Sequence, residues 1–198
     1  ILRKLEEDGN WHWVIACNKL YRKELFQGVR YPIGKLHEDE FVIHQLLLKC
    51  QKVACVSDAL YYYLKHGSSI TGSTFTLRRL DGAEAAFSRA EAFLSNQVPP
   101  VSAYHACAVG LRVLSNSYAQ LSRQDRAYQQ RYRELITKYR TIAKQLLTKR
   151  LPLAYKARLF LNFLSPYHTF MYLERFLIQA KDGKGKDTKD SSPPHERL

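Results

Sequence analysis

The sequence has no long apolar run, few cysteines, and few glycines or prolines. None of its apolar stretches approaches the roughly 18 residues that a membrane-spanning helix needs, so no such helix is predicted. With 9 Gly and 7 Pro in 198 residues, a collagen-like or low-complexity chain is excluded. The four cysteines match no zinc-binding spacing and no dense disulfide framework, and a reducing compartment is expected.

The sequence contains enough apolar residues to form a hydrophobic core, and it carries a large positive charge. Hydrophobic residues make up 45% and aromatic residues 12% of the chain, which excludes wholesale disorder. The formal net charge is +13, from 31 basic and 18 acidic side chains. Residues 123–181 alone carry 13 basic and 3 acidic side chains, so the excess of cations belongs mainly to this segment.

The hydrophobic pattern predicts a mixed first part and a helical second part. Short strands are expected over 11–16, 53–57 and 60–66, and helices over 18–26 and 38–51. After residue 76 the pattern is helical throughout, with helices expected over 77–96, 101–122, 124–149 and 153–180. We therefore expect three regions: a mixed α+β region over 1–75, a helical basic region over 76–181 and a disordered tail over 182–198.

The densest group of ionisable residues is His37-Glu38-Asp39-Glu40 at the start of a predicted helix. One interpretation is structural, since carboxylates near a helix N-terminus interact well with its free N–H groups. The other is catalytic, because adjacent carboxylates raise each other's pKa and suit a general base. His37 and His44 are seven residues apart, so the HExxH spacing of a zinc site is absent and no metal ligand is predicted.

Four motifs in a fixed order resemble the later part of the catalytic domain of family 2 glycosyltransferases, particularly bacterial members that build surface glycans. They are Asn18-Lys19-Leu20-Tyr21-Arg22, the Tyr-Pro-x-Gly step at 31–34, Glu38-Asp39, and Tyr62-Tyr63 followed by Ser69-Ile70. The resemblance covers about residues 11–73. It implies an incomplete GT-A, Rossmann-like fold with two or three short strands, followed by a C-terminal helical bundle.

The resemblance also implies a reaction and roles for individual residues. A sugar would pass with inversion from a nucleotide-sugar donor to a glycan or lipid-linked acceptor. Asp39 would remove the proton of the acceptor hydroxyl, a contribution of about 10²–10⁴ to the rate, and Glu38 would orient the acceptor. Candidate substrate-binding residues are Asn18, Lys19, Arg22, His37, His66, Ser68 and Ser69.

Some of these residues have a second, ordinary interpretation. Lys19 and Arg22 also fit as solvated charges on a short helix. The loop from His66 to Ser69 fits a lid over the donor diphosphate, and equally a plain exit from a strand.

The sequence departs from the family pattern in three places. Ala16-Cys17 stands where an aromatic residue often precedes the Asn-Lys pair, and Leu64-Lys65-His66 where an arginine is common. No Asp-x-Asp motif is present. In the family this motif holds a divalent metal, Mn or Mg, on the donor diphosphate, so we expect the metal ligands in a missing N-terminal half. The chain would then be the later part of a longer enzyme and inactive alone.

Residues 123–181 combine their cations with many aromatic residues, and three interpretations stay open. The first is a helical bundle with an aromatic core and solvated cations. The second is peripheral binding to an anionic membrane through Leu151–Lys181, which suits a lipid-linked acceptor and a cytoplasmic protein at the inner face of the membrane. The third is nucleic-acid binding, which ranks last because no recognition motif is present. A basic binding module for membrane or nucleic acid is thus the alternative to an enzyme.

Overall fold

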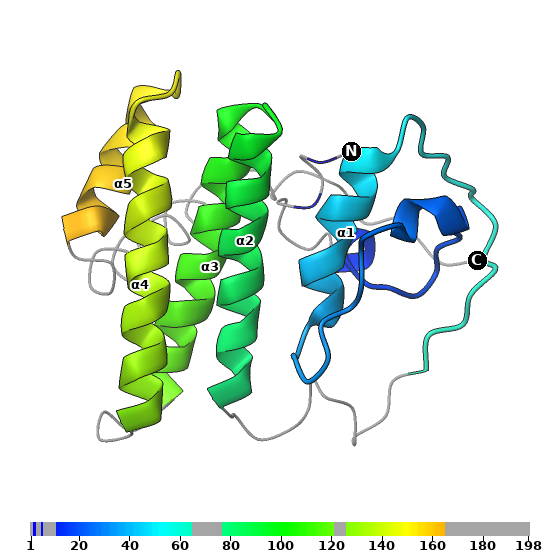
Figure 1. Cartoon of the computed structure of the whole chain (residues 1–198), viewed down its shortest axis with the longest axis horizontal. Coiled ribbons are helices and arrows are strands. Elements are labelled where there is room, and N and C mark those ends of the chain that lie inside the picture. Colours follow the sequence, from blue (N-terminus) through cyan, green and yellow to red (C-terminus); the bar gives the residue numbers. More distant parts are fainter. Residues whose placement is uncertain (1, 3–4, 6–10, 65–76, 121–125, 165–198) are drawn as a thin grey trace, which may run out of the picture.

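The structure, a computed structural model, describes residues 2, 5, 11–64, 77–120 and 126–164 (Figure 1). In this part of the chain all regular elements are helical. They are the 3₁₀ turns η2 (Trp11–Trp13), η3 (Lys23–Phe26) and η5 (Leu77–Leu80), and the helices α1 (Glu38–Lys49), α2 (Asp81–Ser95), α3 (Pro100–Gln120), α4 (Arg126–Leu147) and α5 (Leu153–Leu164). The predicted helices after residue 76 and the helix from residue 38 are therefore confirmed over the described residues.

The α+β fold class expected from the sequence is wrong, because the described residues contain no β-strand. Residues 11–13 form a 3₁₀ turn, and residues 51–64 have no regular secondary structure and are all exposed. Val53, Val56 and Tyr61–Tyr63 favour extended backbone, but a strand also needs a neighbour to pair with. The described residues supply none, so the expected Rossmann-like strands are absent there.

The helices form a layered bundle with α2 and α3 at its centre (Figure 1). On one side α4 packs against this pair and α5 packs against α4, while α1 packs against α2 on the opposite side. The core contains fully buried residues of α2, α3, α4 and α5, among them Phe87, Phe93, Leu114, Tyr139, Ile142 and Leu159, together with Ile43 from α1. The expected domain boundary near residue 75 stays a prediction.

Small residues let α2 and α3 approach closely. Ala83, Ala86 and Ala90 on α2 are fully buried, and Gly110 on α3 lies directly against the ring of Phe87. A Cβ atom at position 110 would come within 2.4 Å of the Phe87 Cε1 atom, which is closer than any normal contact. The Phe87 ring thus fits between the two helices because Gly110 has no side chain.

We expect Gly110→Ala to destabilise the protein by about 1–3 kcal/mol, since overpacking a filled core costs that much. The clash must also outweigh the gain of about 1 kcal/mol that alanine brings within a helix. Gly82→Ala on α2 is the matched control, because the nearest atom to a Cβ there is 3.6 Å away. Chemical denaturation measures both variants, and a Gly110→Ala protein as stable as the parent would contradict the packing described here.

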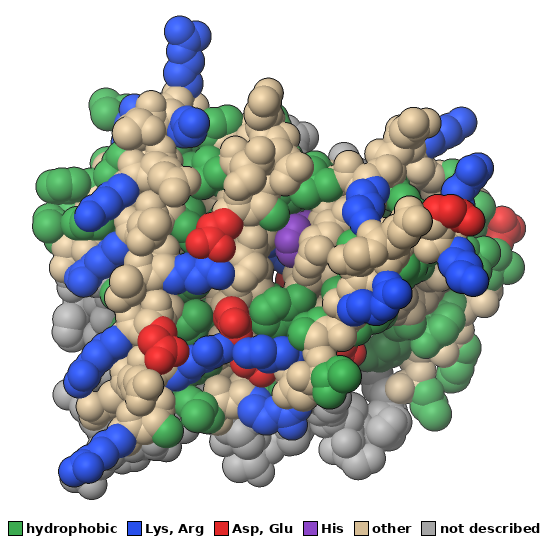
Figure 2. All heavy atoms as spheres, viewed as in Figure 1, with side chains coloured by type: hydrophobic (Ala, Val, Ile, Leu, Met, Phe, Trp, Pro, Cys, Tyr) green, Lys and Arg blue, Asp and Glu red, His purple; other side chains and the backbone are tan. Residues whose placement is uncertain are grey.

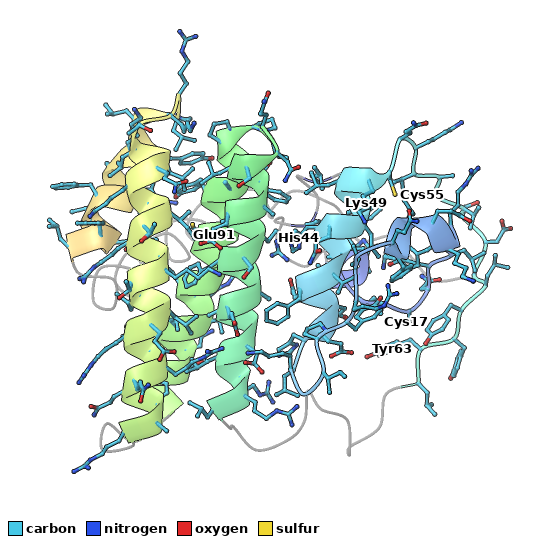
Figure 3. All side chains as sticks on the ribbon, viewed as in Figure 1. Cys17, His44, Lys49, Cys55, Tyr63 and Glu91 are labelled. Carbon is cyan, nitrogen blue, oxygen red and sulfur yellow. The ribbon has the colours of Figure 1, made fainter. Side chains whose placement is uncertain are left out.

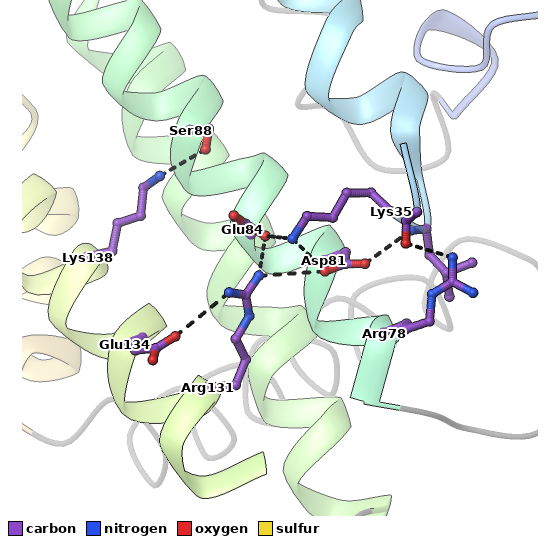
Figure 4. A network of polar contacts seen from close by, with 10 residues as sticks. Lys35, Arg78, Asp81, Glu84, Ser88, Arg131, Glu134 and Lys138 are labelled. Atoms are coloured by element: carbon purple, nitrogen blue, oxygen red, sulfur yellow. Dashed lines mark hydrogen bonds and ion pairs between the residues drawn. The ribbon is translucent and has the colours of Figure 1, made fainter. Parts of the chain in front are cut away.

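A polar network fastens the chain just before α1 to the helical bundle (Figure 4). The buried carboxylate of Asp81 accepts hydrogen bonds from the Lys35 ammonium at 3.2 Å and the Leu36 backbone N–H at 3.1 Å. Glu84 accepts from Lys35 at 2.6 Å and also from Arg131 of α4. These bonds hold residues 35 and 36 in place, and α1 begins directly after them.

Candidate functional site

The three consecutive carboxylates at the start of α1 have three different surroundings. Glu38 is exposed, Asp39 is half-buried, and Glu40 pairs with Arg89 of α2 at 2.5 Å. Successive residues of an α-helix point about 100° apart, since a turn holds 3.6 residues. Glu40 therefore faces the bundle and Asp39 faces the loop that precedes α1.

The carboxyl group of Asp39 has a raised pKa, so its carboxylate is a stronger base than that of an ordinary aspartate. Burial raises the pKa of its carboxyl group, and the neighbouring charges of Glu40 and Glu38 raise it further. The N–H group of Glu40, which donates to Oδ1 at 2.9 Å, partly offsets this effect, as does the N–H of Ala16. The carboxylate therefore binds a proton more readily than an ordinary aspartate does.

Two tyrosines from the preceding loop lie within electrostatic reach of Asp39. Burial, followed by the charges of Asp39 and Glu38, raises the pKa of Tyr31. Burial chiefly raises the pKa of Tyr21 to about 12, with Tyr31 and Asp39 adding to the effect. Both rings lie beside Phe26, at 5.5 and 6.1 Å between ring centres. Both hydroxyls are thus neutral at pH 7 and able to donate hydrogen bonds near the carboxylate.

Lys19 lies on the same side of α1 as these tyrosines. Its hydrogen bonds stabilise the loop of residues 12–19, which faces Asp39. Its ammonium donates hydrogen bonds to the carbonyl oxygens of His12 and Ile15, both at 2.7 Å. Burial lowers the pKa of Lys19, while electrostatic interactions with Cys17 and Asp39 oppose that shift. The lysine thus shapes residues 12–19 and also places a cation near the candidate base.

Two residues with left-handed backbone flank this group. Asn18 has a φ of 59° and His37 a φ of 57°, a region that non-glycine residues rarely occupy. His37 is also the N-cap of α1, and its side chain makes no capping hydrogen bond. Such conformations cost free energy and are over-represented at functional sites. Gln97, in the turn between α2 and α3, shares this conformation with a φ of 56°, so the backbone supports the site only together with the side-chain geometry.

Two of the remaining sequence candidates, Asn18 and Arg22, directly precede Lys19 and follow Tyr21 in the chain, respectively. Asn18 and Arg22 are exposed, and the ring of His37 is turned towards α2, since a Cβ at Gly82 would be 3.6 Å from its Cδ2 atom. His66, Ser68 and Ser69 lie outside the described residues, so the lid stays a prediction. Tyr21 and Tyr31 were not proposed as site residues on their own from the sequence, although both lie within the quoted motifs.

The irregular segment 51–64 passes the same loop. The Tyr61 hydroxyl is hydrogen-bonded to the Cys17 sulfur, which raises the pKa of Tyr61. Figure 3 shows Cys17 and Tyr63 on this side of α1, whereas His44 lies between α1 and α2. Burial lowers the pKa of His44 to about 4, with Arg89 contributing, so His44 is neutral at pH 7 and belongs to the core.

The described residues do not form a metal site. No three His, Cys, Asp or Glu side chains in this part of the chain converge on one point. No described helix is both long enough and apolar enough to cross a membrane.

Comparisons with known proteins point to glycosyltransferases. The chain is 31% identical over 74 residues to glycosyltransferase GlyG of Streptococcus pneumoniae serotype 4, a match that covers 35% of this chain and 25% of GlyG. It is 34% identical over 68 residues to glycosyltransferase GlyA of the same organism, covering 34% of this chain and 10% of GlyA. The matches thus span a quarter or less of these relatives. No family model and no solved structure matches the chain.

Proposed function

We propose that the chain is the acceptor-side part of a family-2-like inverting glycosyltransferase in which Asp39 is the general base. The single observation that carries the proposal is the half-buried Asp39 carboxylate, whose pKa is raised by burial and by its acidic neighbours. The similarity to GlyG and GlyA over about a third of the chain supports the reaction class.

The proposed reaction is a displacement at the anomeric carbon of a nucleotide sugar. The acceptor hydroxyl oxygen forms a bond to that carbon while the bond from the carbon to the nucleoside diphosphate breaks. The hydroxyl proton passes to Asp39, and the electron pair leaves with the diphosphate. A sugar hydroxyl is a weak nucleophile, so a base of raised pKa held at the attacking oxygen favours this step.

The neighbours of Asp39 have supporting roles in this proposal. The neutral hydroxyls of Tyr21 and Tyr31 donate hydrogen bonds to the acceptor sugar, and the exposed Glu38 accepts one from it. Asn18 and Arg22 are exposed, so they can contact the incoming substrate. A divalent metal would meet the charge of the leaving diphosphate, with ligands that we place outside the described residues.

The test is an assay of sugar transfer by the complete enzyme that contains this chain. Radiolabelled hexose and N-acetylhexosamine donors carrying UDP, GDP or dTDP are each supplied with bacterial membrane extract and with a soluble glycan fraction as acceptors. We expect one donor to give a labelled product and a stoichiometric release of its nucleoside diphosphate. Release of the nucleoside diphosphate without any labelled product, or binding of none of these nucleotide sugars, would contradict the proposal.

A further inference from the structure

The outer face of α5 is apolar although it is exposed. Leu153, Phe160, Leu161 and Leu164 are between 42% and 83% exposed. Their spacing of seven, one and three residues places them on one side of the helix, together with the exposed Ala157. The opposite side packs on the bundle through Leu159 and Asn162. A helix at a water-exposed surface normally presents polar residues there, and among the described residues no element covers this apolar face.

A row of cations runs along α4 beside this face. Arg126, Arg133, Arg140 and Lys144 are exposed and recur at intervals of seven, seven and four residues, which places them on one side of α4. Figure 2 shows Lys and Arg side chains following the length of α4, with apolar side chains at the adjoining edge of the molecule. We call these four residues the α4 cation row.

The apolar face and the cation row belong to one continuous surface. The Arg140 guanidinium lies 5.8 Å, and the Lys144 ammonium 5.9 Å, from the centre of the Phe163 ring on α5. Between the two helices, Lys149 and Arg150 are also exposed. Residues 126–164 contain ten basic side chains and a single acidic one, Glu134, which pairs with Arg131 at 3.8 Å. Arg131 and Lys138, on the side of α4 that faces α2, pair with Glu84 and Glu91, whereas the described residues place no acidic partner on the four residues of the α4 cation row.

We propose that the apolar face of α5 and the α4 cation row together dock on an anionic membrane surface. An apolar helix face gains free energy by entering the boundary between head groups and acyl chains, and adjacent cations are attracted to anionic lipids. Charge complementarity favours this occupant over a second copy, because two such surfaces would bring their cation rows together. It also favours lipid over nucleic acid, since phosphates offer no partner for the leucines.

Vesicle co-sedimentation of the full chain tests the proposal without requiring catalysis, so it stands or falls separately from the proposed enzyme function. Vesicles of phosphatidylcholine with about a third phosphatidylglycerol are compared with pure phosphatidylcholine at low salt. We expect strong binding to the anionic vesicles and at least tenfold weaker binding to the neutral ones. Equal binding to both, or binding to neither, would overturn the proposal.

Two double variants separate the apolar and electrostatic contributions. Phe160→Ser with Leu164→Ser changes exposed residues and should weaken binding to anionic vesicles at least tenfold, since each side chain loses apolar burial. Arg133→Gln with Lys144→Gln should weaken it about tenfold and reduce its dependence on salt. The matched controls are Ile33→Ser, which is fully exposed away from this surface, and Lys23→Gln, and neither should change binding.

Light scattering and circular dichroism on the same variants complete the experiment. We expect all of them to keep the helical content and the oligomeric state of the parent chain. If the Phe160 and Leu164 changes leave vesicle binding intact, or instead dissociate a dimer, the face of α5 has a different occupant. If only the cation changes matter, the surface is a general polyanion site, and the proposal is wrong.

Discussion

Replacing Asp39 by Asn is expected to lower sugar transfer by the complete enzyme by a factor of about 10²–10⁴, the usual contribution of a general base. Asparagine keeps the size of the side chain and can still accept the hydrogen bond from the Glu40 N–H, but it cannot take a proton. The loss should appear in kcat/KM, because only the transition state involves proton transfer. A matched control is Glu24→Gln, which removes one exposed carboxylate from η3 and should leave transfer unchanged.

The same substitution should make the fold more stable at neutral pH. Because burial raises the pKa of Asp39 in the folded state, the folded protein binds a proton more readily than the unfolded chain. The charged form therefore costs stability at pH values above the folded-state pKa, and this cost disappears as the pH falls below the unfolded value of about 3.8. Lost activity combined with retained or increased thermal stability identifies a catalytic role. Lost activity caused by unfolding would contradict it.

The second large effect concerns the ion pair that anchors α1 to α2. Arg89 is 1% exposed, and its guanidinium donates to the Glu40 carboxylate at 2.5 Å. We expect Glu40→Gln to destabilise the protein by about 2–4 kcal/mol, because a buried guanidinium then loses its ion pair with Glu40. Urea denaturation at pH 7 measures this loss.

Glu91→Gln provides the comparison for Glu40→Gln. Glu91 pairs with Lys138 at 3.0 Å between partly exposed side chains, and such surface pairs contribute at most about 1 kcal/mol. If the two variants lose similar amounts of unfolding free energy, the burial of Arg89 does not strengthen its ion pair with Glu40. Because the charge of Glu40 also raises the pKa of Asp39, Glu40→Gln should in addition lower that pKa.

Local pattern was sufficient to predict the helices but not the strands. The 3.6-residue periodicity after residue 76 marks α2, α3, α4 and α5, because each helix buries one side against its neighbours. Residues 60–64 are apolar or aromatic and favour extended backbone, yet they are exposed and have no strand beside them among the described residues. Pairing is a property of two segments, so composition alone could not establish it.

The candidate site was predictable in part. The order of the motifs singled out Glu38 and Asp39, but it could not show that Glu40 turns away from them to reach Arg89, which lies 49 residues further along the chain. The proximity of Tyr21 and Tyr31 to Asp39 depends on how the loop folds back on α1, which no local spacing reveals. The pattern likewise predicted a helix over 153–180, but it could not show which side of α5 packs on the bundle and which apolar residues stay exposed.

The pH dependence of kcat/KM for sugar transfer by the complete enzyme tests the central claim most directly. If Asp39 is the base, the rate rises with pH through the pKa of this group in the free enzyme, and the midpoint lies above the ordinary aspartate value of 3.8. Glu40→Gln should move this midpoint to lower pH, and Asp39→Asn should abolish the acid limb. An acid limb that persists unchanged in the Asp39→Asn enzyme would show that another group takes the proton.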